Sequence, residues 1–274
     1  MSILSENILK RLGELDMTQD KLAKLVGYKG RASVNRIING EGDIPFSKIE
    51  VFAHALKTTP AALCGWDMDE DEGGRGFNLE VLAQRLRKNE YDALVFSNKE
   101  EAADYILKRC EGKTVGLANS ITCANADLFD KFRKVSHDEI YESDNHKNRE
   151  SSKKAMIADV YILSAGAISY KSGEMVNITG RGVRVAGSLS ADEVIFLIGK
   201  DKIARNLDEA LYKMRNVYVP KVAKANGYQT PCAKSGKCED CNSVDRVCRF
   251  TGIYHRNFKM VHTTIVLVDE DLGA

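Results

Sequence analysis

The sequence has no long hydrophobic run. No stretch among its 274 residues approaches the roughly 18 consecutive apolar residues that a membrane-spanning helix needs. The N-terminal segment, M-S-I-L-S-E-N-I-L-K, also lacks the apolar run behind a basic start that is typical of a signal peptide. We therefore expect a soluble, cytoplasmic protein that makes no membrane contact.

The sequence also lacks several common catalytic motifs, and its net charge is close to zero. We find no G-x-S-x-G elbow, no Walker phosphate loop and no H-E-x-x-H metal motif. The 40 basic residues nearly balance the 39 acidic ones, for a formal net charge of +1. Overall charge therefore neither indicates nor excludes a nucleic-acid partner, and it has to be read segment by segment. Whether the protein is an enzyme stays open at this point, with a non-catalytic role favoured.

Cysteine is concentrated in one loop. Three of the seven cysteines are isolated, and four lie in a Gly- and charge-rich loop at residues 232–248, separated by gaps of five, two and six residues. These four are Cys232, Cys238, Cys241 and Cys248. Clustered thiols in a reducing compartment more often bind metal than form disulfides. The spacing therefore predicts a single four-cysteine metal centre.

The metal in such a centre can be a four-iron iron–sulfur cluster or zinc. Zinc usually takes two C-x-x-C pairs far apart in sequence, whereas this loop has one pair with a single outlying cysteine on each side. Iron–sulfur clusters are often held by four cysteines in one short loop. Basic residues beside the cysteines, namely Lys234, Lys237, Arg246 and Arg249, would offset the negative charge of the thiolates. We favour iron–sulfur slightly and keep zinc as the alternative.

The first 66 residues have the apolar periodicity of short helices. We expect helices at residues 3–15, 19–26, 31–40, 45–56 and 60–63. Thr18 is well suited to cap the second helix and Gly27 to end it. A short turn at residues 28–30 then leads into the third helix.

Two short helices joined by a tight turn, with polar side chains on the second, are typical of a helix-turn-helix unit. Arginine can bond guanine bidentately and asparagine can bond adenine, while a residue at a helix start can donate to a phosphate. The predicted DNA-contacting residues are Gln19, Lys29, Arg31, Ser33, Asn35 and Arg36. A bundle that only contacts other proteins is the less favoured alternative.

Residues 5–66 resemble the phage-repressor type of helix-turn-helix domain, often called the XRE family. The resemblance rests on M-T-Q-D-K-L-A-K-L-V-G, S-V-N-R-I-I-N-G, I-P-F-S-K-I-E-V-F-A-H-A-L and T-P-A-A-L-C-G-W. It implies an all-α bundle of five helices that binds a double-stranded DNA operator, usually as a homodimer on a palindromic site. A linker follows at residues 67–78, where five acidic residues and three glycines predict a flexible, solvated segment.

Residues 79–274 alternate between predicted strands and helices. We expect strands at residues 93–96, 114–118, 159–167, 183–186, 193–199 and 263–269, and helices at residues 79–88, 98–110, 124–133 and 206–218. This order predicts an open α/β sheet with mainly parallel strands. Ligands of such sheets bind beyond the carboxyl ends of the strands.

That rule and the residue types give the predicted ligand site. Its members are Asn119, Ser120, Thr122, Glu174, Asn177 and Arg184. Glycines at 173, 180 and 182, with Arg181 and Arg184, form a segment that could hold a carboxylate or phosphate, or could equally be a β-hairpin with solvated arginines. Glu174 is a possible general base, but an exposed turn acid is the favoured interpretation.

The same half resembles the LUD family, named for lactate utilisation. The matching stretches are T-V-G-L-A-N-S-I-T, A-D-V-Y-I-L-S-A-G-A-I-S, G-E-M-V-N-I-T-G-R-G-V-R-V-A and the cysteine loop. The resemblance implies a fold like those of sugar-phosphate isomerases and coenzyme A transferases, and a link to lactate oxidation. Ala118-Asn119 stand where that family usually has Gly-Gly.

Together these features predict a transcriptional regulator. Its second unit would sense a small carboxylate effector, or a redox or metal state, through the four-cysteine centre. One alternative is an enzyme or electron-transfer accessory of lactate or 2-hydroxy acid oxidation with an autoregulatory DNA-binding domain. Another is a redox-inert zinc fold in which the cysteines only pin the C-terminal loop.

Overall fold

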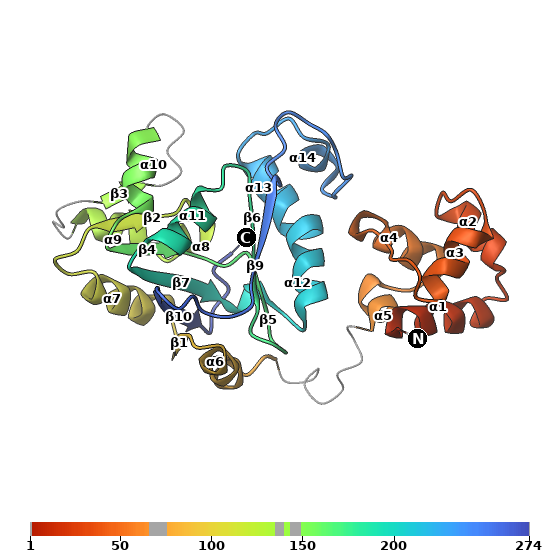
Figure 1. The fold of residues 1–274 in the computed structure, drawn as a ribbon, viewed down its shortest axis with the longest axis horizontal. Coiled ribbons are helices and arrows are strands. Elements are labelled where there is room, and N and C mark those ends of the chain that lie inside the picture. Colours follow the sequence, from red (N-terminus) through yellow and green to blue (C-terminus); the bar gives the residue numbers. More distant parts are fainter. Residues whose placement is uncertain (1, 66–75, 135–139, 143–148, 274) are drawn as a thin grey trace. The chain divides into compact units, whose positions relative to one another are not determined.

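The structure is a computed structural model, and it describes residues 2–65, 76–134, 140–142 and 149–273 (Figure 1). The chain divides into two compact units, one within residues 1–76 and one formed by residues 77–236 and 241–274. The predicted linker falls mostly outside the described residues, except that Asn78 caps the next helix by accepting from the backbone N–H groups of Glu80 and Val81. In the described part of the chain, no helix is both long and apolar enough to cross a bilayer.

The first unit is a bundle of five short helices, as predicted. They are α1 (Ile3–Glu14), α2 (Gln19–Leu25), α3 (Arg31–Ile38), α4 (Phe46–Ala55) and α5 (Pro60–Cys64). Thr18 caps α2 by accepting from the Lys21 N–H at 3.2 Å, and Gly27 follows that helix in the left-handed conformation at φ 74°. Their apolar faces meet in one core that fully buries Ile8, Leu22, Val34, Phe52 and Leu56.

The second unit is built on a six-stranded sheet in the order β1-β10-β7-β4-β2-β3, with every neighbouring pair parallel. The strands are β1 (Asp92–Phe96), β2 (Val115–Leu117), β3 (Ile140–Glu142), β4 (Val160–Leu163), β7 (Glu193–Gly199) and β10 (His262–Val268). All seven residues of β7 are buried, because helices cover both faces of a parallel sheet. The predicted open parallel α/β sheet is therefore confirmed.

Helices pack on both faces of this sheet (Figure 1). One face carries α7 (Lys99–Arg109), α8 (Ile121–Asn125) and α9 (Leu128–Lys134). The other carries α6 (Leu79–Lys88), α10 (Arg149–Met156) and α11 (Val183–Ser190). The approach of α10 to β2 is so close that a Cβ on Gly116 would lie 2.1 Å from the Ala155 carbonyl oxygen.

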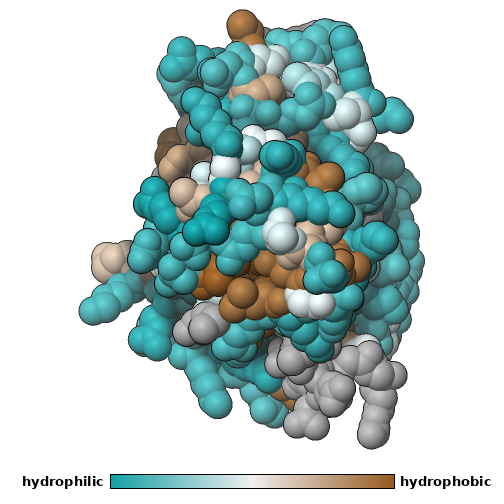
Figure 2. Space-filling model, turned by 90° about the vertical axis from the view of Figure 1, so that its right-hand side faces the viewer, coloured by the Kyte–Doolittle hydropathy of each residue, from teal (hydrophilic) through white to brown (hydrophobic). Residues whose placement is uncertain are grey.

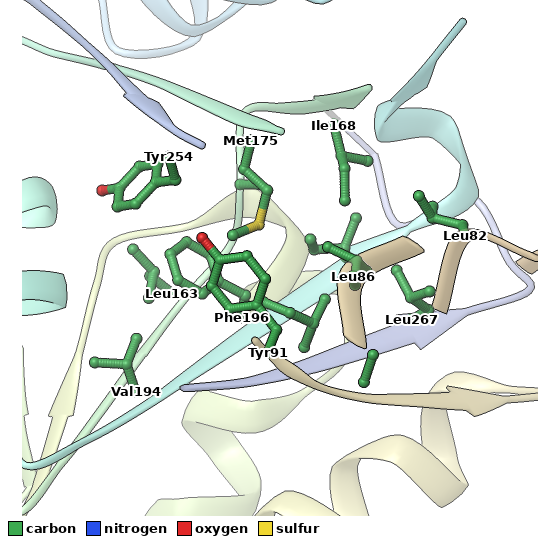
Figure 3. Packing of buried hydrophobic residues seen from close by; sticks show 14 of the residues in the cluster. Leu82, Leu86, Tyr91, Leu163, Ile168, Met175, Val194, Phe196, Tyr254 and Leu267 are labelled. Carbon is green, nitrogen blue, oxygen red and sulfur yellow. The ribbon is translucent and has the colours of Figure 1, made fainter. Parts of the chain in front are cut away.

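A second sheet, which the sequence did not reveal, lies over the α6 side of the large sheet. Its order is β8-β5-β6-β9, with strands β5 (Ala167–Ser169), β6 (Met175–Thr179), β8 (Ile203–Ala204) and β9 (Phe250–Tyr254). Alternate residues face opposite sides, as the period of a strand requires. Ile168, Met175 and Tyr254 join the core shared with Leu86 and Phe196 (Figure 3).

The opposite side of the small sheet packs on a long, irregular helix. Ala167, Val176 and Ala204 lie against a run made of α12 (Leu207–Lys213), a π-helical turn (Met214–Tyr218) and α13 (Val219–Ala225). Pro220 has no N–H for the usual i−4 bond, which accounts for the wider turn just before it. A last short helix, α14 (Pro231–Ser235), opens the cysteine loop.

Four predicted elements are wrong in detail. The strand expected at 159–167 ends at Leu163 in β4, and Ala167 begins β5 of the second sheet. Residues 183–186 were expected as a strand but form the first turn of α11, because Gly182 turns the chain at φ 78° and Gly187 then packs on the Tyr161 ring. The helix expected at 124–133 is split into α8 and α9, with Asp127 between them at φ 55°. The helix expected at 206–218 runs on through the π-helical turn to Ala225.

An ion-pair cluster around the buried Glu193, at the start of β7, allows a stability test. Glu193 accepts from Arg109 Nε at 2.5 Å and from Lys113 Nζ at 2.6 Å. Burial raises the pKa of Glu193, but the hydrogen bonds and charges of Lys113 and Arg109 outweigh burial and hold the pKa below its usual value. The stabilisation is therefore present above the ordinary glutamate pKa of about 4.3 and is lost as the pH falls through the lower, folded-state value.

We expect Glu193→Gln to destabilise the α/β unit by about 1–2 kcal/mol at neutral pH. Chemical denaturation at pH 7 and at about pH 3 measures this, and the difference between variant and wild type should shrink at the lower pH. Glu111→Gln, which removes an exposed acid, is the control. An equal loss of stability at both pH values would contradict the assignment to the ionised carboxylate.

Candidate functional site

The outer face of α3 is polar and exposed. Lys29, Arg31, Ser33, Asn35 and Arg36 are all exposed, and Gln19 at the start of α2 is half-buried. The inner face is the buried set Val34, Ile37 and Ile38. The structure thus places the predicted DNA-contacting residues on α3, on the turn before it and at the start of α2, and the guanidinium of Arg36 also donates to the Glu41 carbonyl at 3.3 Å.

Side chains of α4 hold the turn between α2 and α3 in place. The ring of Tyr28 meets Phe52 edge-on at 5.8 Å, and Lys48 Nζ lies 4.2 Å above the Tyr28 ring. Lys48 also donates to the Val26 carbonyl at 3.3 Å. These contacts hold the turn and so set the direction of α3. Figure 2 shows a mainly hydrophilic surface with scattered hydrophobic side chains, and its most continuous apolar area lies just below the centre of the view.

A cavity of about 160 Å³ lies in the second unit at the carboxyl ends of β2, β4 and β7. Asn119 and Ser120 follow β2, Gly166 follows β4, and Lys202 follows β7. From the end of β2 the chain continues to β3 on one side, whereas from the end of β4 it continues to β7 on the other. The cavity therefore lies where the strand connections diverge, which is the usual ligand position in open α/β sheets.

Among the residues that the structure describes, the charged side chains lining the cavity are cations and none is a carboxylate. Arg181, Arg184 and Lys202 are its charged lining residues. Arg184 Nη2 donates to the Asn119 carbonyl at 2.7 Å, which joins the start of α11 to the end of β2. Lys202 is only 5% exposed, and burial lowers its pKa despite the nearby Asp201. The electrostatics of this cavity favour a small anion.

Four of the six predicted ligand residues line this cavity: Asn119, Ser120, Thr122 and Arg184. The other two do not. Glu174 accepts from Ser172 Oγ at 2.7 Å and contacts His255 Nδ1, so it lies in the β5–β6 turn. Asn177 is fully buried and its Oδ1 accepts from the Gly166 N–H at 2.9 Å, so it supports the cavity wall from behind.

Sequence reasoning missed Lys202 and the wall formed by the helix after β8. That wall includes Met214, Tyr218, Val219 and Val222, from the π-helical turn and α13. A π-helical turn is often found at functional sites, and Pro220 was the one sequence signal for it. Arg181, noted only as part of a Gly-rich segment, also lines the cavity.

The cysteine loop is cross-braced by one arginine. Arg246 Nε lies 3.2 Å from the Cys248 sulfur, and Arg246 Nη1 donates to the Cys241 carbonyl at 2.7 Å. Cys232 is buried in the first turn of α14, with its sulfur 3.2 Å from the Thr230 hydroxyl. All four loop cysteines are free thiols, and no group of three or more metal-ligating side chains is preassembled within the described residues.

Two of the three cysteines outside the loop, Cys110 and Cys123, do not have the lowered pKa of a reactive cysteine. Burial raises the pKa of Cys110 to about 12 and that of Cys123 to about 11. Such thiols stay protonated and inert at neutral pH. Cys110 and Cys123 are therefore not candidates for thiolate chemistry near pH 7.

Each of the two units matches a different family model. A helix-turn-helix family model matches residues 8–63, and an LUD domain model matches residues 79–268. A crystal structure of a DUF162 family protein from Deinococcus radiodurans is similar at 11% identity and a TM-score of 0.40, covering 69% of this chain and 95% of that one. No curated protein matches.

The helix-turn-helix match supports DNA-binding regulation, and the LUD match relates the second unit to lactate utilisation. The LUD model alone covers well over half of the chain. The chain therefore belongs to the LUD domain family and carries a helix-turn-helix unit ahead of that domain.

Proposed function

We propose that this protein is a DNA-binding transcriptional regulator whose LUD domain binds a small anionic effector. The observation that carries the proposal is the cation-lined cavity at the diverging strand ends, in the same chain as an exposed polar recognition helix. The effector controls DNA binding only if it binds the DNA-competent and DNA-incompetent states unequally. We further propose that the regulator acts as a homodimer, as the two-fold symmetry of most helix-turn-helix operators requires.

The lining of the cavity fits anion binding, and the buried Lys202 is its one described group with the chemistry of a general base. Its titratable lining groups are arginine, lysine and tyrosine side chains. Burial raises the pKa of the Tyr218 hydroxyl to about 12, so it stays neutral at pH 7. Proton abstraction near pH 7 is usually carried out by a histidine or a carboxylate. Glu174, the general base considered from the sequence, lies away from this lining.

The four loop cysteines form the proposed metal or redox centre. Four thiolates are a donor set that fits either zinc or a four-iron cluster. Arg246 already lies against Cys241 and Cys248, where its charge would offset that of the thiolates. Metal binding would draw the sulfurs together and order the loop, since such sites commonly gain folding free energy from the metal.

The DNA-binding part is tested by substitution on α3. Asn35→Ala should weaken binding to the DNA upstream of the protein's own gene by about tenfold or more, because a bidentate base contact is worth about 1–3 kcal/mol. Alanine is a good helix former, so the bundle should fold normally. Lys10→Ala, at an exposed position on α1, is the control in a fluorescence anisotropy titration. Equal losses from both variants would argue against base reading by α3.

Effector sensing is tested on the same DNA. Addition of lactate or pyruvate, as representative small carboxylates, should shift the DNA dissociation constant by about fivefold or more. The same samples, incubated with an electron acceptor, report any turnover of lactate. Unchanged DNA binding with every anion tried would reject the sensing role, and turnover would favour the enzyme of 2-hydroxy acid oxidation instead.

The metal centre is tested on anaerobically purified protein. Elemental analysis should find about four irons or about one zinc per chain, and the visible spectrum separates the two because only iron–sulfur clusters absorb there. Cys241→Ser should lose the metal, whereas Cys123→Ser, at a buried cysteine outside the loop, should keep it. Metal-free protein with all four loop thiols open to alkylation would remove the centre from the proposal.

A further inference from the structure

The charged side chains that line the cavity are all cationic within the described part of the chain. They are Arg181, Arg184 and Lys202. Outside the lining, Asp201 Oδ2 lies 3.4 Å from Lys202 Nζ and offsets one of them. The other two are arginines, and Arg184 also donates to the Asn119 carbonyl. A lactate-like anion carries one negative charge, whereas a phosphate monoester carries about 1.5–2 at pH 7.

Lys202 is the most costly of these charges to bury. Its side chain is about nineteen-twentieths buried, and Asp201 and the Tyr218 ring, at 4.7 Å, are its contacts in the described part of the chain. An ammonium has three N–H donors, and a carboxylate oxygen at 3.4 Å is a distant partner for one of them. A buried charge with spare donors at a cavity wall is stabilised when a ligand supplies oxygen acceptors.

The helix that opens onto the cavity also offers unused donors. Within the described residues, no side chain caps the N-terminus of α11, where Gly182 stands at the N-cap position. The first-turn N–H groups of a helix have no partner inside the helix, and they attract anions. The helix after β2 is different, because the Ser120 side chain caps α8 by accepting from the Cys123 N–H at 3.4 Å.

The chain leading to α11 is shaped for close approach of a ligand. Gly180 and Arg181 line the cavity just before the helix, and Arg184 lines it from the first turn. The Gly182 N–H donates to Thr179 Oγ1 at 3.2 Å, which fixes the loop. A Gly-rich loop that runs into a helix N-terminus with basic side chains around it is a recurrent phosphate site.

We propose that the effector is a small phosphate monoester, whose phosphate is held by Arg181, Arg184, Lys202 and the first turn of α11. The proposal rests on the effector role proposed above and names the ligand class of that site. The short carbon chain of the ester would lie against the apolar wall of Met214, Val219 and Val247, which faces the same cavity.

A matched ligand pair tests this. Isothermal titration of the full-length protein with 2-phospholactate and with lactate compares two ligands that differ only in the phosphoryl group. We expect 2-phospholactate to bind about tenfold tighter or better, because it makes several charge-assisted hydrogen bonds that lactate lacks. Inorganic phosphate should compete with it at the same site, with weaker binding.

Three variants locate the site. Lys202→Gln and Arg184→Gln should each reduce 2-phospholactate affinity by about tenfold or more, with lactate binding changed less. Lys224→Gln removes an exposed charge from α13 outside the cavity lining and should leave both affinities unchanged. Denaturation curves of each variant establish that the α/β unit is folded, and the Arg184 variant decides the outcome if the Lys202 variant is not.

Lactate binding as tight as 2-phospholactate, or equal losses in the Lys224 and Lys202 variants, would overturn the phosphate assignment. The phosphate assignment and the proposed effector sensing can fail independently in these experiments. If carboxylates alone bind and shift DNA affinity, the regulator stands and the phosphate assignment fails. If 2-phospholactate binds as described but DNA affinity does not move, the phosphate site stands and sensing fails.

Discussion

The arrangement of the LUD unit depends on one constraint, the parallel pairing of strands that are buried on both faces. β7 lies between β10 and β4 and is covered along its whole length. Parallel neighbours need crossover connections, and these connections are the helices that cover the two faces. Because the chain leaves β2 and β4 toward opposite sides, no helix can close the space between their ends, and the cavity lies there.

The second sheet completes the cavity without interrupting that ladder. Its strands present alternate residues to two different cores, one shared with the large sheet and one shared with α12 and α13. The π-helical turn before Pro220 brings Met214 and Tyr218 to the cavity wall. The apolar side of the site is thus set by packing, while its charged side comes from the loop before α11 and the turn after β7.

Much of this fold could be predicted from sequence because local and tertiary preferences agree. The apolar run of β7 and the cap at Thr18 lead to the same assignment from the local pattern and from the tertiary fold. Val183 to Ala186 mislead because their pattern looks like a strand, whereas the helix there depends on Gly182 and on the fit of Gly187 against Tyr161. The second sheet pairs β6 with β9, and such distant pairing leaves no local signal.

Part of the ligand site could be predicted from the sequence, again where the local pattern agrees with the tertiary fold. Asn119, Ser120 and Thr122 follow a strand whose end is evident in the sequence, and the strand-end rule then suffices. Lys202 stands in the polar stretch K-D-K, which is typical of an exposed turn, and only the tertiary fold buries it. Glu174 has the residue type of a catalytic base, but the β5–β6 turn engages it with Ser172.

One residue of the cysteine loop also forms part of the wall of the ligand cavity. Val247, adjacent in sequence to Cys248, lines the cavity, and its backbone lies so close to Gly180 that a Cβ there would be 3.1 Å from the Val247 carbonyl oxygen. A rearrangement of the sulfur atoms that displaced this peptide would therefore reshape the cavity beside Arg181. By thermodynamic reciprocity, a molecule that held the peptide in place would in turn alter the affinity of those sulfurs for a metal ion.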